Sequence, residues 1–241
     1  LFSEESEERA IFSRVVGPGL VDGVIVTATR IGDTLIGRLA DAGVPFVVVG
    51  RPDDAGRAPS VDADNRGGAR AAALHLAGLG YERIGMISPP SNTTAGIDRR
   101  TGFADGMSEA GRDLGGRLCE GDWSEESGRL AMQRMLADRP DAVFVGSDRM
   151  AVGALRAIRD AGLSCPGDVA VVSFDGILPA DQTVPRLTSV AQPVSACGDR
   201  AAQILHTIIS GEVDTPEAVV FPTELVIRES CGAALRQRVT P

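Results

Sequence analysis

The sequence predicts an α/β fold built on parallel β-sheets. Short apolar runs, which are expected to be strands, alternate with helical patterns of 3.6-residue period along most of the 241 residues. The runs are almost continuously apolar, as in residues 45–49 (PFVVV) and 142–145 (AVFV), which is typical of strands buried on both faces. The alternation breaks after Ile177. We therefore expect parallel sheets covered by helices on both faces, with a change of topology late in the chain.

The first half of the chain alternates strand and helix three times. In order, it is expected to hold a strand at 21–27, a helix from Asp33 to Gly43, a strand at 45–49, a helix at 65–79, a strand at 83–87 and a helix at 99–110. Asp33 is expected to cap the first of these helices, because its carboxylate can accept a hydrogen bond from a free N–H of the first turn. Gly80 and Gly111 follow the other two helices, where glycine commonly ends a helix.

The second half continues the pattern and then departs from it. In order, it is expected to hold a helix at 124–137, a strand at 142–145, a helix at 148–161, a strand at 169–174, an extended piece at 187–190, a helix at 194–210 and short strands at 218–221 and 224–228. Pro179, Pro185 and Pro193 bracket the extended piece and account for the break. An acidic helix is also expected over residues 3–14.

Composition and charge exclude several classes of protein. No apolar run is long enough to cross a bilayer, and the acidic N-terminus does not have the pattern of a signal peptide. The net charge is −9, without a Lys/Arg-rich block, which argues against broad phosphate binding by these residues alone. The cysteines are far apart and form no CxxC pair, as expected of reduced thiols in the cytoplasm. A cytoplasmic location without a membrane partner is therefore expected.

The sequence lacks the motifs of common enzymes. It contains no GxGxxG after a strand, no GxxxxGK[ST], no GxSxG and no HExxH, and His75 and His206 lie far apart in helical patterns. Asp148 and Asp175 each follow a strand, and two carboxylates near one site could act on a glycoside. Asp148, however, opens a helix, where an N-cap is the simpler interpretation. We expect no catalytic activity, no metal and no cofactor.

Trp123, the only tryptophan, is expected in a loop at a strand end. Ligands of parallel α/β sheets bind outside the carboxyl ends of the strands. An indole there offers a flat apolar face and one N–H donor, which suits a sugar ring. The alternative is that Trp123 only fills the gap between loop and sheet.

Eight short motifs follow one another along nearly the whole chain. They are 21–25 (VDGVI), 43–49 (GVPFVVV), 61–84 (with VDADN, HL and LGYERI), 99–103 (RRTGF), 147–154 (SDRMAVGA), 166–175 (PGDVAVVSFD), 185–193 (PRLTSVAQP) and 224–230 (ELVIRES). In this order they resemble motifs of the effector-binding core of lactose-repressor/galactose-repressor (LacI/GalR) transcription regulators. Any one motif is weak, whereas eight in order make coincidence implausible.

The resemblance implies a two-lobed, periplasmic-binding-protein-like fold whose chain crosses between the lobes three times. The N-terminal lobe would comprise residues 1–62 and 193–221, and the C-terminal lobe residues 63–192 and 222–235. Effector would bind between the lobes, and its binding would change operator affinity allosterically in a homodimer. DNA would be bound by a helix-turn-helix headpiece absent from these residues. The family's core itself opens with one more βα unit that these residues lack, so we expect them to be part of a longer chain.

The resemblance also assigns candidate effector-binding residues. Trp123 falls where an aromatic ring often stacks on the effector, and Arg99 where a guanidinium holds effector oxygens. Asp175 falls on an aspartate that accepts hydrogen bonds from effector hydroxyls or an amine. Further candidates are Ser147, Thr27 and Gln192.

The resemblance leaves three points open at these positions. Arg99 could instead form a surface ion pair at a helix start, and Asp175 could be a plain strand-end turn. Gly176 departs from the Asp or Asn usual in the family, which predicts a looser turn beside Asp175. Indole, carboxylate and guanidinium together favour a saccharide or polyol effector, with a purine as the alternative.

Two other classes of protein fit the sequence less well than a ligand-sensing regulator. A secreted sugar-binding protein of a transport system shares the two-lobed fold, but the motifs at 185–193 and 224–230, four unpaired cysteines and the lack of an export signal oppose it. A sugar-processing enzyme lacks a catalytic constellation. The sequence therefore favours a ligand-sensing regulator core.

Overall fold

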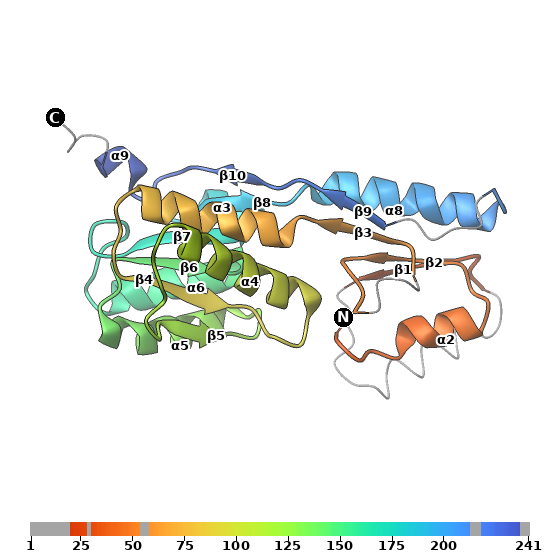
Figure 1. Cartoon of the computed structure of the whole chain (residues 1–241), viewed down its shortest axis with the longest axis horizontal. Coiled ribbons are helices and arrows are strands. Elements are labelled where there is room, and N and C mark those ends of the chain that lie inside the picture. Colours follow the sequence, from red (N-terminus) through yellow and green to blue (C-terminus); the bar gives the residue numbers. More distant parts are fainter. Residues whose placement is uncertain (1–19, 28–29, 54–57, 213–217, 237–241) are drawn as a thin grey trace. The chain divides into compact units, whose positions relative to one another are not determined.

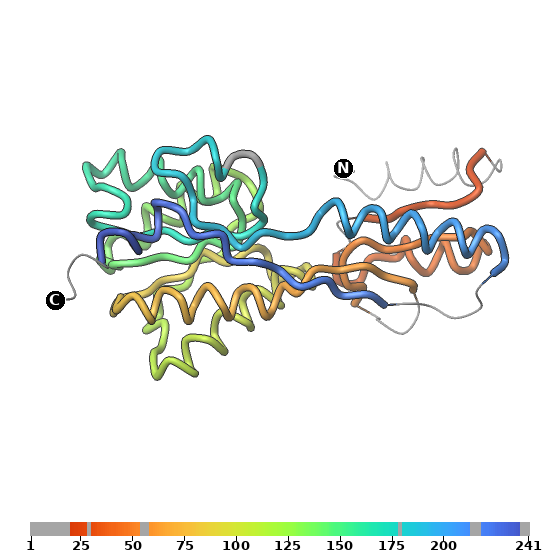
Figure 2. The backbone as a smooth tube through the Cα atoms, turned by 90° about the horizontal axis from the view of Figure 1, so that it is seen from above, coloured from red at the N-terminus to blue at the C-terminus, as the bar shows by residue number. Residues whose placement is uncertain are grey.

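The computed structural model describes residues 20–27, 30–53, 58–212 and 218–236 (Figure 1). The chain divides into two units, unit 1 (Leu1–Asp62 and Val194–Val220) and unit 2 (Ala63–Pro193 and Phe221–Pro241). It therefore passes from one unit to the other three times (Figure 2). The acidic helix expected over residues 3–14 lies outside the described residues. The predicted α/β class, with parallel sheets flanked by helices, is confirmed.

Unit 1 is built on the sheet β1–β2–β3–β9. Its strands are β1 (Val24–Thr27), β2 (Phe46–Val49), β3 (Ser60–Ala63) and β9 (Ala218–Phe221), with β1, β2 and β3 parallel. Helices α2 (Leu35–Asp41) and α8 (Val194–Ile209) belong to the same unit. The predicted capping role of Asp33 is confirmed, because its Oδ1 accepts a hydrogen bond from the N–H of Leu35, the first residue of α2, at 2.8 Å. Thr34, which directly precedes the helix, makes no side-chain cap hydrogen bond.

Unit 2 is built on a six-stranded sheet in the order β10–β8–β7–β6–β4–β5. The strands are β4 (Ile84–Ser88), β5 (Leu118–Glu120), β6 (Ala142–Val145), β7 (Ala170–Asp175), β8 (Thr188–Ala191) and β10 (Glu224–Val226). Only β10 runs antiparallel to its neighbour. The helices are α3 (Asn65–Gly78), α4 (Thr94–Glu109), α5 (Glu125–Met135) with the 3-10 turn η2 (Leu136–Asp138), α6 (Asp148–Asp160), α7 (Leu178–Gln182) and α9 (Ala233–Arg236).

Helices cover both faces of this sheet, with α3 and α4 on one face and α5 and α6 on the other (Figure 1). Successive strand residues point to opposite faces. In β6, Phe144 packs with α3 and α4, and the centre of its ring lies 4.6 Å from that of Phe103 in a stacked arrangement. Val143 and Val145 pack with α5 and α6 on the other face. Every residue of β6 is therefore buried, which explains why the strand is apolar throughout.

Two helices of unit 2 begin where the sequence did not predict. Helix α4 begins at Thr94, five residues before the predicted start, because Thr93 accepts a hydrogen bond from the Gly96 N–H as its N-cap. Arg99 consequently lies in the second turn, facing the sheet. Helix α6 has Ser147 as its N-cap, so the interpretation of Asp148 as the cap is wrong.

The strand order creates a switch point in unit 2. From β4 the chain goes to β5 on one side and then to β6 on the other. Ligands of such sheets bind outside the carboxyl ends of the strands at this point. We call the end of the sheet formed by the last residues of β4, β5, β6, β7 and β8 the carboxyl edge, and the opposite end the amino edge.

Candidate ligand-binding site at the carboxyl edge

Arg99 is buried at the carboxyl edge and held from three directions. Its side chain is 4% exposed. Nη1 donates to the Gly146 carbonyl at 2.7 Å and to Asp175 Oδ1 at 2.8 Å, while Nε donates to Asn65 Oδ1 at 2.9 Å. The guanidinium also lies 3.9 Å from the centre of the Phe174 ring. The alternative of a surface ion pair at a helix start is therefore wrong.

Asp175 ends β7 in a strained backbone conformation. Its φ is 119°, a region that residues with a Cβ seldom adopt. Oδ1 accepts from Arg99 and, at 2.8 Å, from Gln192 Nε2, and the Gln192 N–H donates to the Asp175 carbonyl at 3.0 Å. Burial raises the pKa of Asp175, although the Arg99 guanidinium opposes that shift. The side chain remains 17% exposed, so the carboxylate can accept a hydrogen bond from a ligand.

Trp123 follows β5, and its neighbours fix its position. The N–H of Ser124 donates to Asp122 Oδ1 at 2.9 Å, and the N–H of Asp122 donates to Ser127 Oγ at 3.0 Å. Ser124 also caps α5 by accepting from the Ser127 N–H. Between these bonds Trp123 has a φ of 72°, and its half-buried ring lies 5.4 Å from the Arg99 guanidinium. The loop thus holds the indole next to Arg99 and leaves part of it exposed.

The structure brings four of the six predicted residues together: Trp123, Arg99, Asp175 and Gln192. Ser147 is buried, and its hydroxyl accepts from the Met150 N–H at 3.2 Å as the cap of α6. It follows Gly146, whose carbonyl holds Arg99. Thr27 ends β1 in unit 1, where it is exposed.

The sequence interpretation missed two residues that hold Arg99. Asn65 lies in the motif VDADN and is buried at the start of α3 with its amide on the guanidinium. Phe174 precedes Asp175 on β7, and its ring lies under the same guanidinium. Asn65 had a signal, a polar residue in a recognised motif, whereas Phe174 looks like any buried strand residue. Both stabilise the position of Arg99.

Backbone strain is concentrated at this edge. Among the described residues, three that are not glycine have a positive φ: Trp123, Arg139 and Asp175. Arg139 follows the 3-10 turn η2, where a left-handed residue is an ordinary way to end a helix. Trp123 follows β5 and Asp175 ends β7, and strain of this kind clusters at ligand sites.

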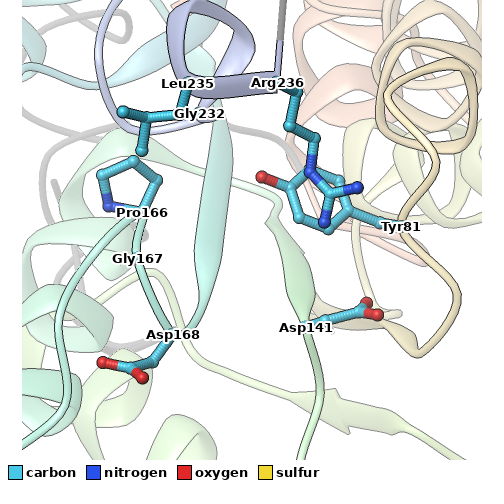
Figure 3. A pocket seen from close by; sticks show the side chains of 8 residues that line it. All are labelled: Tyr81, Asp141, Pro166, Gly167, Asp168, Gly232, Leu235 and Arg236. Carbon is cyan, nitrogen blue, oxygen red and sulfur yellow. The ribbon is translucent and has the colours of Figure 1, made fainter. Parts of the chain in front are cut away.

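The amino edge carries a small hollow of about 250 Å³, shown in Figure 3. It is lined by Tyr81, Asp141, Pro166, Gly167, Asp168, Gly232, Leu235 and Arg236. The charged groups there already have partners. Asp141 accepts from two main-chain N–H groups, Asp168 accepts from Ser164, and Arg236 lies over the Tyr81 ring. The hollow therefore lacks the arrangement of polar groups that the carboxyl edge has.

Within the described ranges, no group of three or more His, Cys, Asp or Glu side chains is placed to hold a metal ion. No helix in the described part of the chain is both long and apolar enough to cross a membrane.

Comparisons with known proteins identify the family. A profile of the periplasmic binding protein-like domain matches residues 73–231. The HTH-type transcriptional regulator CelR of Thermobifida fusca is 39% identical over 215 residues, which cover 87% of this chain and 63% of CelR. The chain belongs to the LacI family. The chain spans less than two thirds of the length of CelR.

Solved structures agree with this assignment to the LacI family. The CelR–cellobiose complex superposes with a TM-score of 0.90 at 36% identity, covering 94% of this chain and 71% of that chain. A LacI-family regulatory protein from Chloroflexus aggregans superposes with a TM-score of 0.86 at 30% identity, covering 96% and 84%. The predicted family and fold are confirmed.

Proposed function

We propose that this LacI-family chain senses a saccharide or polyol through the carboxyl edge of unit 2. The observation that carries the proposal is the buried Arg99–Asp175 pair with Gln192 and Trp123 beside it. A sugar has a C–H face that stacks on an indole and hydroxyls that bind to carboxylate and amide groups. The groups at this edge are matched to both features.

A relative supports the choice of ligand class. The CelR structure that superposes on this chain is a complex with cellobiose. Cellobiose is therefore the first probe for this chain. The purine alternative remains an outcome of the test, because an indole and an Asp–Arg pair can also hold a heterocycle.

We infer that the whole protein is a cytoplasmic DNA-binding regulator and a homodimer. The relative CelR is named an HTH-type regulator, and this chain covers 63% of it. Operator DNA would be bound by another part of the protein, since the present residues carry a net charge of −9. Ligand affinity and operator affinity would be coupled. The limits of the two lobes would be those predicted from the sequence. Ser147 and Thr27 remain proposed ligand contacts on the basis of the resemblance.

The burial of Asp148 argues against catalysis. Glycoside hydrolysis needs two carboxyl groups that reach the substrate. Asp148 is fully buried, and its carboxylate accepts three hydrogen bonds from the protein. It therefore has no access to a sugar, and we propose binding without turnover.

Calorimetric titration with cellobiose, ribose, sorbitol and hypoxanthine tests the proposal. We expect saturable binding of a sugar or polyol, which is recovered unchanged. Arg99→Lys should weaken it by at least tenfold, because lysine cannot reproduce the fork of bonds to Gly146, Asp175 and Asn65. Arg100→Lys, at the exposed neighbouring position, is the matched control and should bind as the unmodified chain does. Binding of hypoxanthine alone, or equal effects of the two variants, would contradict the proposal.

A further inference from the structure

The two peptide groups that follow Asp175 are fixed by one buried polar cluster. The Gly176 N–H donates to Ser189 Oγ at 3.1 Å, and the Ile177 N–H donates to Asp148 Oδ2 at 2.9 Å. These two N–H groups belong to the turn that leaves β7. The turn is therefore tied to α6 through Asp148 and to β8 through Ser189.

Asp148 is the centre of this cluster. It is fully buried, and its Oδ1 accepts from Ser173 Oγ at 2.5 Å and from Ser189 Oγ at 2.7 Å. The Ser189 hydroxyl thus donates a hydrogen bond to Asp148 and accepts one from the Gly176 N–H. Hydroxyl and main-chain donors compensate a buried carboxylate, which would otherwise be costly.

Helix capping does not account for Asp148. Ser147 is the N-cap of α6 and accepts the Met150 N–H. Asp148 is the first residue of the helix, and its carboxylate is directed to β7, β8 and the turn. A negative group at a helix start is mildly stabilising in any protein, but that effect does not require contacts to three other segments.

The turn after Asp175 also packs closely against β8. Gly176 has a φ of 70°, and a Cβ added there would lie 2.5 Å from Ala191 Cα. The expectation that Gly176 loosens this turn is therefore wrong, because glycine lets the turn pack against β8. The strained φ of 119° at Asp175 needs such a surrounding, since strained conformations persist only where neighbouring contacts impose them.

We propose that Asp148 and Ser189 are positioning residues of the ligand site, which hold the turn after Asp175 so that its carboxylate stays on Arg99 and Gln192. Neither residue touches the ligand. The inference rests on the proposed function, because it concerns the affinity of the same site.

Two serine-to-alanine variants give a matched test. Ser189 and Ser230 are both fully buried, and each hydroxyl donates one hydrogen bond and accepts one. Ser230 bonds to the Val171 carbonyl and the Thr188 N–H, at the amino end of the strands. Both variants lose a buried hydroxyl, but only Ser189→Ala acts on the turn after Asp175.

Affinity for cellobiose, or for the sugar of the panel that binds best, is the first readout. Ser189→Ala should weaken binding by about tenfold, the equivalent of one buried hydrogen bond, and Ser230→Ala by less than about twofold. Asp148→Asn should weaken it similarly, and the double variant by no more than the stronger single change, because both act through one cluster. Equal effects of Ser189→Ala and Ser230→Ala would overturn the inference while leaving sugar binding by the unmodified chain intact. Absence of sugar binding by the unmodified chain would overturn the proposed function and the inference together.

Amide hydrogen exchange in the ligand-free protein is the second readout. The N–H groups of Gly176 and Ile177 should exchange faster in Ser189→Ala than in the unmodified chain, and at an unchanged rate in Ser230→Ala. A general loss of stability would instead accelerate exchange in both variants alike. Equal exchange at these two positions in the two variants would overturn the inference whatever the ligand is.

Discussion

The two edges of the six-stranded sheet differ in how their charged groups are satisfied. At the amino edge, Asp141 and Asp168 are held by main-chain N–H groups and a serine hydroxyl, and Arg236 lies over Tyr81 (Figure 3). At the carboxyl edge, the buried guanidinium of Arg99 on α4 binds one side chain of α3, one side chain of β7 and one carbonyl of the loop after β6.

The difference between the edges supports the proposal that the ligand binds at the carboxyl edge. The carboxyl edge combines a buried ion pair with strained backbone at Trp123 and Asp175, and both features reduce stability unless the surrounding structure compensates them. Among the residues that line the hollow at the amino edge there is neither a buried ion pair nor a non-glycine residue with a positive φ.

Substitution of the aspartates at the two ends of β7 should affect sugar affinity very differently. Asp175→Ala leaves Arg99 buried without its carboxylate, so we expect the free energy of unfolding to fall by about 3–5 kcal/mol. Sugar affinity should fall at least a hundredfold. Asp168→Ala, at the other end of the strand, should leave affinity unchanged. Denaturant unfolding and calorimetry measure the two quantities, and a similar loss of affinity in both variants would break the contrast between the edges.

Gly176 and Gly162 offer a second comparison, since both have a φ near 70°. Gly176→Ala adds a clash with Ala191 to the cost of the left-handed conformation and should reduce the free energy of unfolding by about 2–4 kcal/mol. A Cβ at Gly162 meets nothing within 4 Å, so Gly162→Ala should cost about 1–2 kcal/mol. Urea unfolding of both variants is the measurement, and equal losses would show that the turn after Asp175 is loosely packed.

Trp123 can be removed in two ways that separate binding from stability. Trp123→Ala and Trp123→Gly should both weaken sugar binding by about 1–3 kcal/mol, because the stacked ring is lost. Glycine suits the φ of 72°, so Trp123→Gly should be more stable than Trp123→Ala by about 1 kcal/mol. If instead either variant binds sugar with unchanged affinity, the indole only fills the gap between loop and sheet.

His75 should give the smallest effect. Its Nε2 is buried without a hydrogen-bond partner among the described residues, and burial lowers the pKa of the imidazole. Because the folded state disfavours the protonated ring, the free energy of unfolding should fall as the pH drops below the ordinary value of 6.5. His75→Leu should flatten this dependence between pH 7.5 and 5.5 in urea unfolding, whereas an unchanged slope would show that His75 stays solvated.

Most of the fold was predictable because periodicity and buried parallel strands leave a direct trace. The run at 142–145 is apolar throughout and that at 169–174 is apolar except for Ser173, and both are central strands with helices on each face. Helix starts were less predictable. Asp33 accepts the Leu35 N–H as predicted. Asp148 also has the chemistry of a cap, but Ser147 takes that position, in extended backbone with its hydroxyl on the Met150 N–H.

The candidate site was predictable in its polar residues and not in their supports. Arg99, Asp175, Gln192 and Trp123 come from motifs that resemble those of a known family, and the structure places them together. Their support depends on contacts between residues far apart in sequence, such as Asn65 with Arg99 and Asp148 with Ser189. No local pattern records such contacts, and a buried carboxylate at a helix start resembles an ordinary cap.

The fluorescence of the only tryptophan tests the central claim most directly, because every change in the signal reports on position 123. We expect titration with cellobiose or another sugar of the panel to change the emission of the unmodified chain in a saturable way. The same titration of Arg99→Lys should require at least tenfold more ligand, and that of Arg100→Lys should not. A sugar that binds by calorimetry while the emission stays constant would place the ligand away from Trp123 and would contradict a binding site at the carboxyl edge.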